Sequence, residues 1–236
     1  MFLKEAAKNM MNTGGSEMTD VRVLGDPESV NTFIQMVDDH DLDHMESQAA
    51  ELERLAGTDW CLVTVKVRNW NNDLTPWKAG PVFGSEGFGD GASETLKIIL
   101  EDVIPVFERE YPSEGRRYYM AGYSLAGLFA LWSAYETDRF DGAVAASPSV
   151  WYPGWIGFAE SHEFRAERAY LSLGDRESKT RNQTMAAVAD NILRQKELLE
   201  ASGKDCVLEW NPGNHFRDAD KRTARGMSWM LKKSGR

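Results

Sequence analysis

The sequence predicts an α/β fold in which a mostly parallel, twisted sheet is flanked by helices. Short apolar runs rich in β-branched residues alternate along the 236-residue chain with segments whose apolar residues recur at helical spacing. Strands that alternate with helices form largely parallel sheets, because each helix carries the chain back across one face of the sheet. With 42% hydrophobic residues and no internal repeat or linker, residues 1–236 are expected to form one domain.

The first elements follow from local patterns. Residues 1–19 are expected to be a loosely ordered N-terminal extension. Val21–Leu24 and Thr32–Val37 are apolar runs on either side of a turn signal that contains Gly, Asp and Pro, which predicts an opening hairpin. Apolar residues at helical spacing predict a helix over residues 42–52. Cys61–Val67 is predicted to be a β-branched strand.

The stretch from Asn69 to Gly91 contains Pro, Gly, Asn and Trp without periodicity, so it is predicted to be a long loop. Loops of this length inside a compact domain are usually functional. Apolar residues between positions 96 and 107 indicate a helix that is kinked at Pro105, because the proline ring removes a backbone hydrogen bond.

The rest of the chain continues the alternation of strands and helices. After a strand and an apolar helix around residues 118–132, its expected elements are a strand at Gly142–Ala146, an aromatic connection at residues 147–155, a strand at Tyr170–Leu173, a helix at residues 185–192, a strand at Val207–Trp210 and a closing helix at residues 224–231.

Composition and charge exclude several kinds of partner. A net charge of −10 and a pI near 5.0 argue against a nucleic acid or an anionic membrane. No stretch approaches the roughly 20 apolar residues of a membrane span. The N-terminus lacks the apolar segment of a signal peptide, so a cytoplasmic protein is expected. Cys61 and Cys206 open apolar runs and are interpreted as small buried hydrophobic residues rather than a disulfide or metal pair.

The most informative segment is residues 118–127, where Ser124 lies between an apolar strand pattern and a wholly apolar helix pattern. Gly122 and Ala126 flank the serine two residues away on either side. A serine on a sharp strand-to-helix turn holds its hydroxyl clear of the sheet only if these neighbours carry almost no side chain. An isolated pentapeptide of this kind is more often an ordinary turn. Its placement here predicts a nucleophile elbow with Ser124 as the nucleophile.

A serine nucleophile needs a base, and His215 is the candidate. It follows the last expected strand, in a loop of turn-forming residues that would bring it to the sheet edge beside the elbow. His162 lies in a charged segment and His44 in a helical pattern, so these two are interpreted as surface and structural residues.

The acid that orients the base is expected after the strand at Tyr170–Leu173. Asp175 and Glu177 both follow Gly174 at that point. Glu177 has the longer reach toward an imidazole, whereas Asp175 is also suited to capping the turn. The residue pattern leaves both open.

The oxyanion formed during acyl transfer needs two backbone donors. One is expected from the amide of Leu125 at the start of the elbow helix, where the helix dipole favours negative charge. The second is expected after the Thr32–Val37 strand, at Asp39 or His40. The acidic residues that crowd this second loop are interpreted as helix caps rather than a metal site, so neither a metal nor another cofactor is predicted.

Aromatic residues gather in two loops that are expected at the same sheet edge. They are Trp70 and Trp77 in the first loop, and Trp151, Tyr152 and Trp155 in the second. Such residues either wall a site for an apolar or aromatic group or close a small core beneath long loops. Tyr123 in the elbow is a further candidate for substrate contact. So is Arg68, which is suited either to an anionic group or to an ion pair with Asp73.

With these residues assembled, the chain resembles the esterase branch of the α/β hydrolases that includes esterase D and the enterochelin-esterase-like and siderophore-ester hydrolases. The resemblance runs from about Thr32 onward. It rests on residues 122–127, close to G-x-S-x-G-G, on Gly174–Glu177, close to G-x-x-acid, on Arg68 with residues 73–76, close to R…D-L-T-P, and on Asn214-His215. It implies a single-domain α/β-hydrolase fold with reduced N-terminal strands. It also implies that Glu177 rather than Asp175 is the acid of the triad.

The expected function is that of a serine carboxylic-ester hydrolase, which acts through an acyl-enzyme intermediate on a small or aromatic small-molecule ester. One alternative is acyl transfer by the same triad to an alcohol other than water. The other is a non-catalytic binding protein that keeps the hydrolase fold. The presence of all three polar groups in the expected order favours catalysis.

Overall fold

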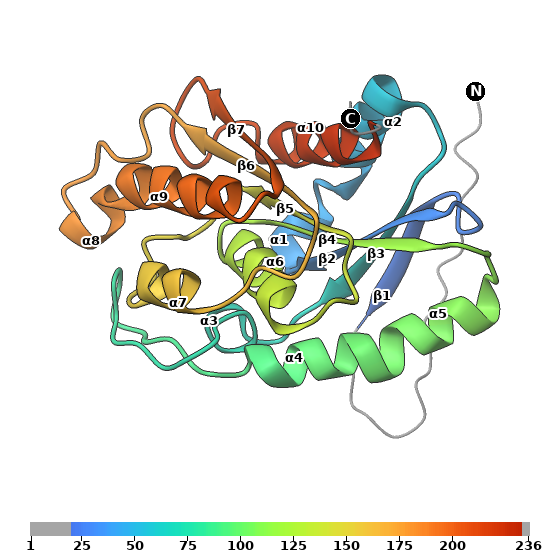
Figure 1. Ribbon diagram of the computed structural model, residues 1–236, viewed down its shortest axis with the longest axis horizontal. Coiled ribbons are helices and arrows are strands. Elements are labelled where there is room, and N and C mark those ends of the chain that lie inside the picture. Colours follow the sequence, from blue (N-terminus) through green and yellow to red (C-terminus); the bar gives the residue numbers. More distant parts are fainter. Residues whose placement is uncertain (1–19, 233–236) are drawn as a thin grey trace.

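The computed structural model describes residues 20–232, so the N-terminal extension predicted for residues 1–19 lies outside the described residues. Within that range, one seven-stranded sheet forms the centre (Figure 1). Its strands are β1 (Val21–Gly25), β2 (Asn31–Val37), β3 (Cys61–Lys66), β4 (Arg117–Tyr123), β5 (Gly142–Ala146), β6 (Arg168–Gly174) and β7 (Asp205–Asn211). Their order is β1-β3-β2-β4-β5-β6-β7, and every neighbouring pair except β1 and β3 is parallel. The predicted mostly parallel α/β fold is confirmed.

Helices cover both faces of the sheet. They are α1 (Asp39–Leu42), α2 (Met45–Ala56), α3 (Trp70–Asp73), α4 (Ala92–Ile98), the π-helical turn η1 (Ile99–Val103), α5 (Ile104–Glu110), α6 (Leu125–Glu136), α7 (Trp155–Ser161), α8 (Gln183–Ala186), α9 (Val188–Ala201) and α10 (Ala219–Leu231). On one face, Leu52 of α2 and Met227 of α10 share an apolar cluster with Phe33 and Tyr170 of the sheet. The helices from α4 to α9 bury their apolar sides in a second cluster on the other face. The sequence of α6 is apolar on nearly every side, and the helix is buried at every residue but its last.

The opening hairpin predicted for Val21–Leu24 and Thr32–Val37 is wrong. β3 lies between β1 and β2, antiparallel to β1, with Val23 opposite Val63, and parallel to β2. Every residue of β2 is buried, as expected for a central strand of a parallel sheet that has helices on both faces. β1 alternates buried and exposed residues, a pattern that suits the edge of a sheet.

The long helix predicted for residues 96–107 continues through Pro105 as α4, η1 and α5 (Figure 1). The amide of Ile104 donates to the carbonyl of Ile99, five residues earlier, instead of the usual four. Pro105 follows directly and has no amide hydrogen to donate. The irregularity that the sequence predicted as a kink takes the form of a π-helical turn.

The predicted long loop at residues 69–91 contains the short helix α3 and a bridge between Ala79 and Phe88. Leu74 and Phe88 are buried and attach the loop to the core. The carboxylate of Asp73 accepts the backbone amide of Arg68 at 3.0 Å. Among residues 20–232, the helices are too short or too polar to span a bilayer.

Candidate active site

Ser124 lies at the turn between β4 and α6, with a backbone φ of 59° and ψ of −122°. A positive φ is unfavourable for a residue with a side chain and costs about 1–3 kcal/mol. The close packing of β4 against α6 accounts for this positive φ. A Cβ atom placed on Gly122 would lie 2.3 Å from the backbone of Ala126, and one on Gly127 would lie 3.1 Å from the carbonyl oxygen of Gly122. Small neighbours of Ser124 are therefore a steric requirement.

The substitution Gly122→Ala is expected to destabilise the fold and to lower ester hydrolysis per folded molecule. The added methyl group would overlap the backbone of Ala126, and overpacking of this kind costs about 1–3 kcal/mol. Gly157→Ala is the matched control, because a Cβ atom at that exposed position meets nothing within 4 Å. Calorimetric melting and hydrolysis of a p-nitrophenyl ester measure both effects. A Gly122→Ala protein that melts and reacts like the wild type would contradict the close contact between Gly122 and the backbone of Ala126.

His215 lies between Ser124 and Glu177. Its Nε2 atom is 3.0 Å from Ser124 Oγ, and its Nδ1 atom is 2.8 Å from Glu177 Oε2. The three residues follow β4, β6 and β7, whose carboxyl ends meet at one edge of the sheet because these strands are parallel. The side chain of His215 is 26% exposed and that of Glu177 is 4% exposed. A substrate can thus reach the histidine but not the acid behind it.

Glu177 is held as a carboxylate by the groups around it. Its Oε1 atom accepts the hydroxyl of Ser147 and the amide of Gly174, each at 2.7 Å, and an N–H of Arg222 at 3.0 Å. Burial by itself would raise the pKa of Glu177. The hydrogen bond and charge of His215, together with the bonds from Ser147 and Gly174, outweigh burial and hold this pKa below its usual value. Glu177 is therefore ionised at neutral pH.

Asp175, the alternative acid, does not bond to the imidazole and instead ties the loop of His215 to the end of β6. Its exposed carboxylate accepts the amide of Gly213 at 2.8 Å, and its own amide donates to the carbonyl of Asn211 at 2.8 Å. Tyr123, an expected substrate contact, holds the same loop, since its hydroxyl donates to the carbonyl of His215 at 2.6 Å.

The expected oxyanion donors lie at the starts of two helices. Leu125 is the first residue of α6, and Asp39 and His40 are the first two residues of α1. Asp38 caps α1 by accepting the amide of Asp41 at 2.8 Å, and the amides of Asp39 and His40 have no acceptor among residues 20–232. Burial and the neighbouring Asp38 carboxylate raise the pKa of Asp41 to about 6. Within the same residues, no group of three or more His, Cys, Asp or Glu side chains is arranged to hold a metal ion.

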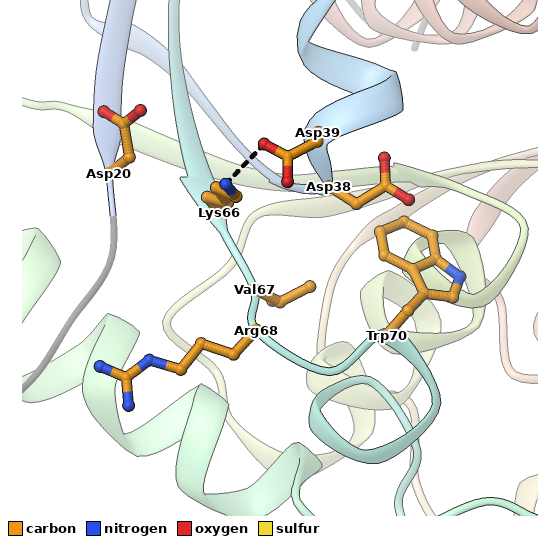
Figure 2. Close-up of a pocket in the computed structure, with 7 residues that line it drawn as sticks. All are labelled: Asp20, Asp38, Asp39, Lys66, Val67, Arg68 and Trp70. Carbon is orange, nitrogen blue, oxygen red and sulfur yellow. Dashed lines mark hydrogen bonds and ion pairs between the residues drawn. The ribbon is translucent and has the colours of Figure 1, made fainter.

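A pocket of about 510 Å³ opens beside α1 (Figure 2). It is lined by Asp20, Asp38, Asp39, Lys66, Val67, Arg68 and Trp70. Lys66 Nζ pairs with Asp39 Oδ1 at 2.5 Å. Figure 2 shows Trp70 and Asp38 on one side of the opening and the Arg68 side chain directed away from both. Two of the expected substrate contacts, Arg68 and Trp70, thus share a pocket with the expected oxyanion donor Asp39.

The other aromatic candidates pack against one another. Tyr152 and Trp155 are 1% and 0% exposed, and Trp151 is 7% exposed. Trp77 contacts Tyr152 with 5.8 Å between the ring centroids, which joins the loop at residues 69–91 to the connection after β5. Tyr152 and Trp155 are therefore buried among other side chains, as in the second of the two interpretations of the sequence, in which the aromatic residues close a core beneath the loops.

Three polar residues at the site were not found from the sequence. Ser149 Oγ lies 3.4 Å from Ser124 Oγ, and Ser147, which has a φ of 43°, bonds to Glu177. Both serines lie in a connection that stands out in the sequence only for its aromatic residues. The third is the buried residue Arg222 in α10. The only sequence pattern that could have indicated its burial is helical spacing, because it lies four and eight residues before Gly226 and Met230, which are also buried.

Solved structures that share this fold include a siderophore hydrolase, a serine hydrolase and an enterobactin esterase. The siderophore hydrolase EstA from Aspergillus nidulans has a TM-score of 0.69 at 22% sequence identity, over 89% of each chain. An IroE-like serine hydrolase from Shewanella oneidensis has a TM-score of 0.72 at 17% identity, over 89% of this chain and 75% of that chain. The enterobactin esterase FES from Shigella flexneri has a TM-score of 0.65 at 14% identity, over 89% of this chain and 54% of that chain. At these identities the likeness shows a common fold alone.

The family comparison goes further than the fold. The model of the Esterase family, whose description is "Putative esterase", matches residues 41–217, a range that includes Ser124, Glu177 and His215. The protein belongs to this esterase family, and its class of activity is the hydrolysis of carboxylic esters. The family resemblance found from the motifs is confirmed. No curated protein matches the sequence.

Proposed function

We propose that this esterase works as a serine hydrolase in which Ser124 is the nucleophile, His215 the base and Glu177 the acid. The observation that carries the proposal is the continuous chain of hydrogen bonds, 3.0 Å from serine to imidazole and 2.8 Å from imidazole to carboxylate. A serine hydroxyl is a weak nucleophile unless a base takes its proton, and the acid holds the base in the correct tautomer.

In the acylation step, Ser124 Oγ attacks the carbonyl carbon of the ester while its proton passes to His215 Nε2. The charge that develops on the carbonyl oxygen is met by the amide of Leu125 and by an amide of α1, from Asp39 or His40; both helix starts favour negative charge. When the intermediate collapses, His215 returns the proton to the leaving alcohol. Water then repeats the same sequence on the acyl-enzyme, and the acid product leaves.

The pocket beside α1 is the proposed site for part of the substrate, because Asp39 belongs both to its lining and to the proposed oxyanion donors. The indole of Trp70 offers this pocket an aromatic surface, which suits a small-molecule ester with an aryl or bulky alkyl group. Arg68 and Lys66 line the same pocket. Trp77 and Trp151 pack against the aromatic residues Tyr152 and Phe88, respectively, and so support the loops at this sheet edge.

A fluorophosphonate probe, which phosphonylates activated serines, tests the proposal. The wild-type protein is expected to be labelled at Ser124, as located by mass spectrometry, and Ser124→Ala is expected to stay unlabelled. Ser161→Ala, at an exposed serine outside the site, is the matched control and should be labelled like the wild type. A folded wild-type protein that resists labelling would favour the non-catalytic binding protein. A labelled protein that forms a new ester faster than the free acid when an alcohol is added would favour acyl transfer.

Hydrolysis is expected to increase with pH, because a general base accepts the serine proton only in its unprotonated form. Glu177 is not expected to add a second rise in the hydrolysis rate at pH values above the usual pKa of glutamate, because its lowered pKa keeps it ionised there. The same lowered pKa stabilises the fold at pH values above the usual glutamate pKa, and this stabilisation is lost as the pH falls through the lowered value. Measurement of kcat/KM between about pH 5 and 8 checks the rise. A flat profile would contradict a histidine base.

A further inference from the structure

The helix α10 carries a buried arginine, Arg222, that the proposed mechanism does not use. Its side chain is 1% exposed, whereas arginine side chains are rarely buried unless they are paired. A buried charge is unfavourable unless hydrogen-bond acceptors surround it. The acceptors around this guanidinium therefore indicate what the side chain does.

The Nη1 end of the guanidinium reaches the surroundings of the acid. It donates to Glu177 Oε1 at 3.0 Å, to Ser147 Oγ at 3.1 Å and to Tyr123 Oη at 3.2 Å. These acceptors lie at the ends of β6, β5 and β4, three neighbouring strands. Because donors occupy Oε1, the carboxylate is left with Oε2 to accept the hydrogen bond from the imidazole of His215.

The Nη2 end reaches the loop of the base. It donates to the carbonyl oxygens of Pro212 at 3.3 Å and Asn214 at 3.1 Å, in the loop that leaves β7. Tyr123, whose hydroxyl accepts from Nη1, donates in turn to the carbonyl of His215. One rigid, planar group thus fixes the backbone beside the base and the carboxylate of the acid at the same time.

We infer that Arg222 is a positioning residue that sets the geometry of the Glu177–His215 pair. The inference rests on the proposed function, since it concerns the acid and base of that reaction. Arg222 does not line the pocket beside α1, so its loss should lower kcat and leave KM nearly unchanged. Lysine is not equivalent, because a single ammonium group lacks the planar fork that serves acceptors on two sides.

A double-mutant cycle between Arg222→Met and Glu177→Ala tests the inference. Methionine keeps an unbranched stem and removes every donor. In the wild-type background, Arg222→Met is expected to lower kcat by about 10- to 100-fold, the range typical of residues that orient a reacting group. In the Glu177→Ala background, the same change is expected to alter kcat by less than about threefold, because the acid that it positions is gone. Rates are expressed per active site titrated with the fluorophosphonate probe, which removes any unfolded fraction.

Two further variants make the cycle specific. Lys221→Met removes a positive charge from the exposed side of α10, one residue away, and is expected to leave kcat unchanged. Arg222→Lys keeps the charge without the fork and is expected to lower kcat by about tenfold. If Arg222→Met does not fold, Arg222→Lys takes its place in the cycle. Its effect on kcat is then likewise expected to disappear in the Glu177→Ala background.

The outcomes separate this inference from the proposed function. An equal fold-loss in both backgrounds, or a loss that appears in KM rather than kcat, would show a general structural role and overturn the inference. Full activity of Arg222→Met would overturn it too. In these cases labelling of wild-type Ser124 would still support the proposed function. A folded wild-type protein that is neither labelled nor active would overturn both.

Discussion

Replacement of Ser124 by alanine is expected to lower the turnover of p-nitrophenyl acetate by about 10³-fold or more, and His215→Ala is expected to have a similar effect. The two side chains act as one unit, because the hydroxyl 3.0 Å from Nε2 is reactive only while the imidazole can take its proton. Loss of either member leaves only the contribution of the oxyanion donors and of binding. The initial rate of nitrophenolate release, measured on variants that melt like the wild type, checks the prediction.

His162→Ala is the matched control for the histidine. This exposed residue of the segment after α7 makes no contact with Ser124, so its loss should leave turnover within the experimental error. If Ser124→Ala retained turnover near that of the wild type, the serine mechanism would be wrong even though the protein belongs to an esterase family.

Glu177→Ala is expected to lower turnover by about 10²-fold or more, which is less than the loss for Ser124→Ala, because the acid orients and stabilises the imidazole without reacting. Asp175→Ala is expected to have a much smaller effect. The reason is geometric: Glu177 Oε2 lies 2.8 Å from Nδ1 of His215, whereas Asp175 caps the amide of Gly213.

The two substitutions are to be compared at a pH where the rate of each variant no longer changes with pH, so that a change in the pH profile does not mimic a loss of orientation. The reverse ranking would move the role of the acid to Asp175 and leave the rest of the mechanism intact. Small and equal effects would indicate that Ser124 and His215 work as a dyad.

Much of the fold and of the site's arrangement follows from local sequence patterns. The elbow could be found because its steric demand falls on consecutive residues: an added Cβ at Gly122 would overlap Ala126. The loops of Glu177 and His215 could be placed because parallel strands bring their carboxyl ends to one edge. The choice between Asp175 and Glu177 could not be made from spacing alone, since both follow Gly174 and differ only in what each contacts.

Other features depend on long-range contacts that local patterns do not encode. β1 and β2 look like a hairpin because they are adjacent in sequence, but β2 is a fully buried central strand and pairs with β3 and β4 instead. The role of Arg222 could not be predicted from its charge, because its acceptors come from the end of β4 and from three separate loops. Whether Tyr152 and Trp155 line a substrate site or belong to a buried core could not be decided from the sequence, because the residues that bury them are distant along the chain.

The position of α10 along the chain affects how the molecule is made. This helix comes last among the described elements, yet it packs against α2, which comes near the beginning, and against β5 and β6 (Figure 1). A chain that leaves the ribosome from its N-terminus therefore exposes Ser124 well before the segments that hold His215 and Arg222 have emerged. Such contacts between distant parts of the chain form late in folding. Under the proposed mechanism, ester hydrolysis therefore requires that β7, the loop of His215 and α10 have all joined the fold.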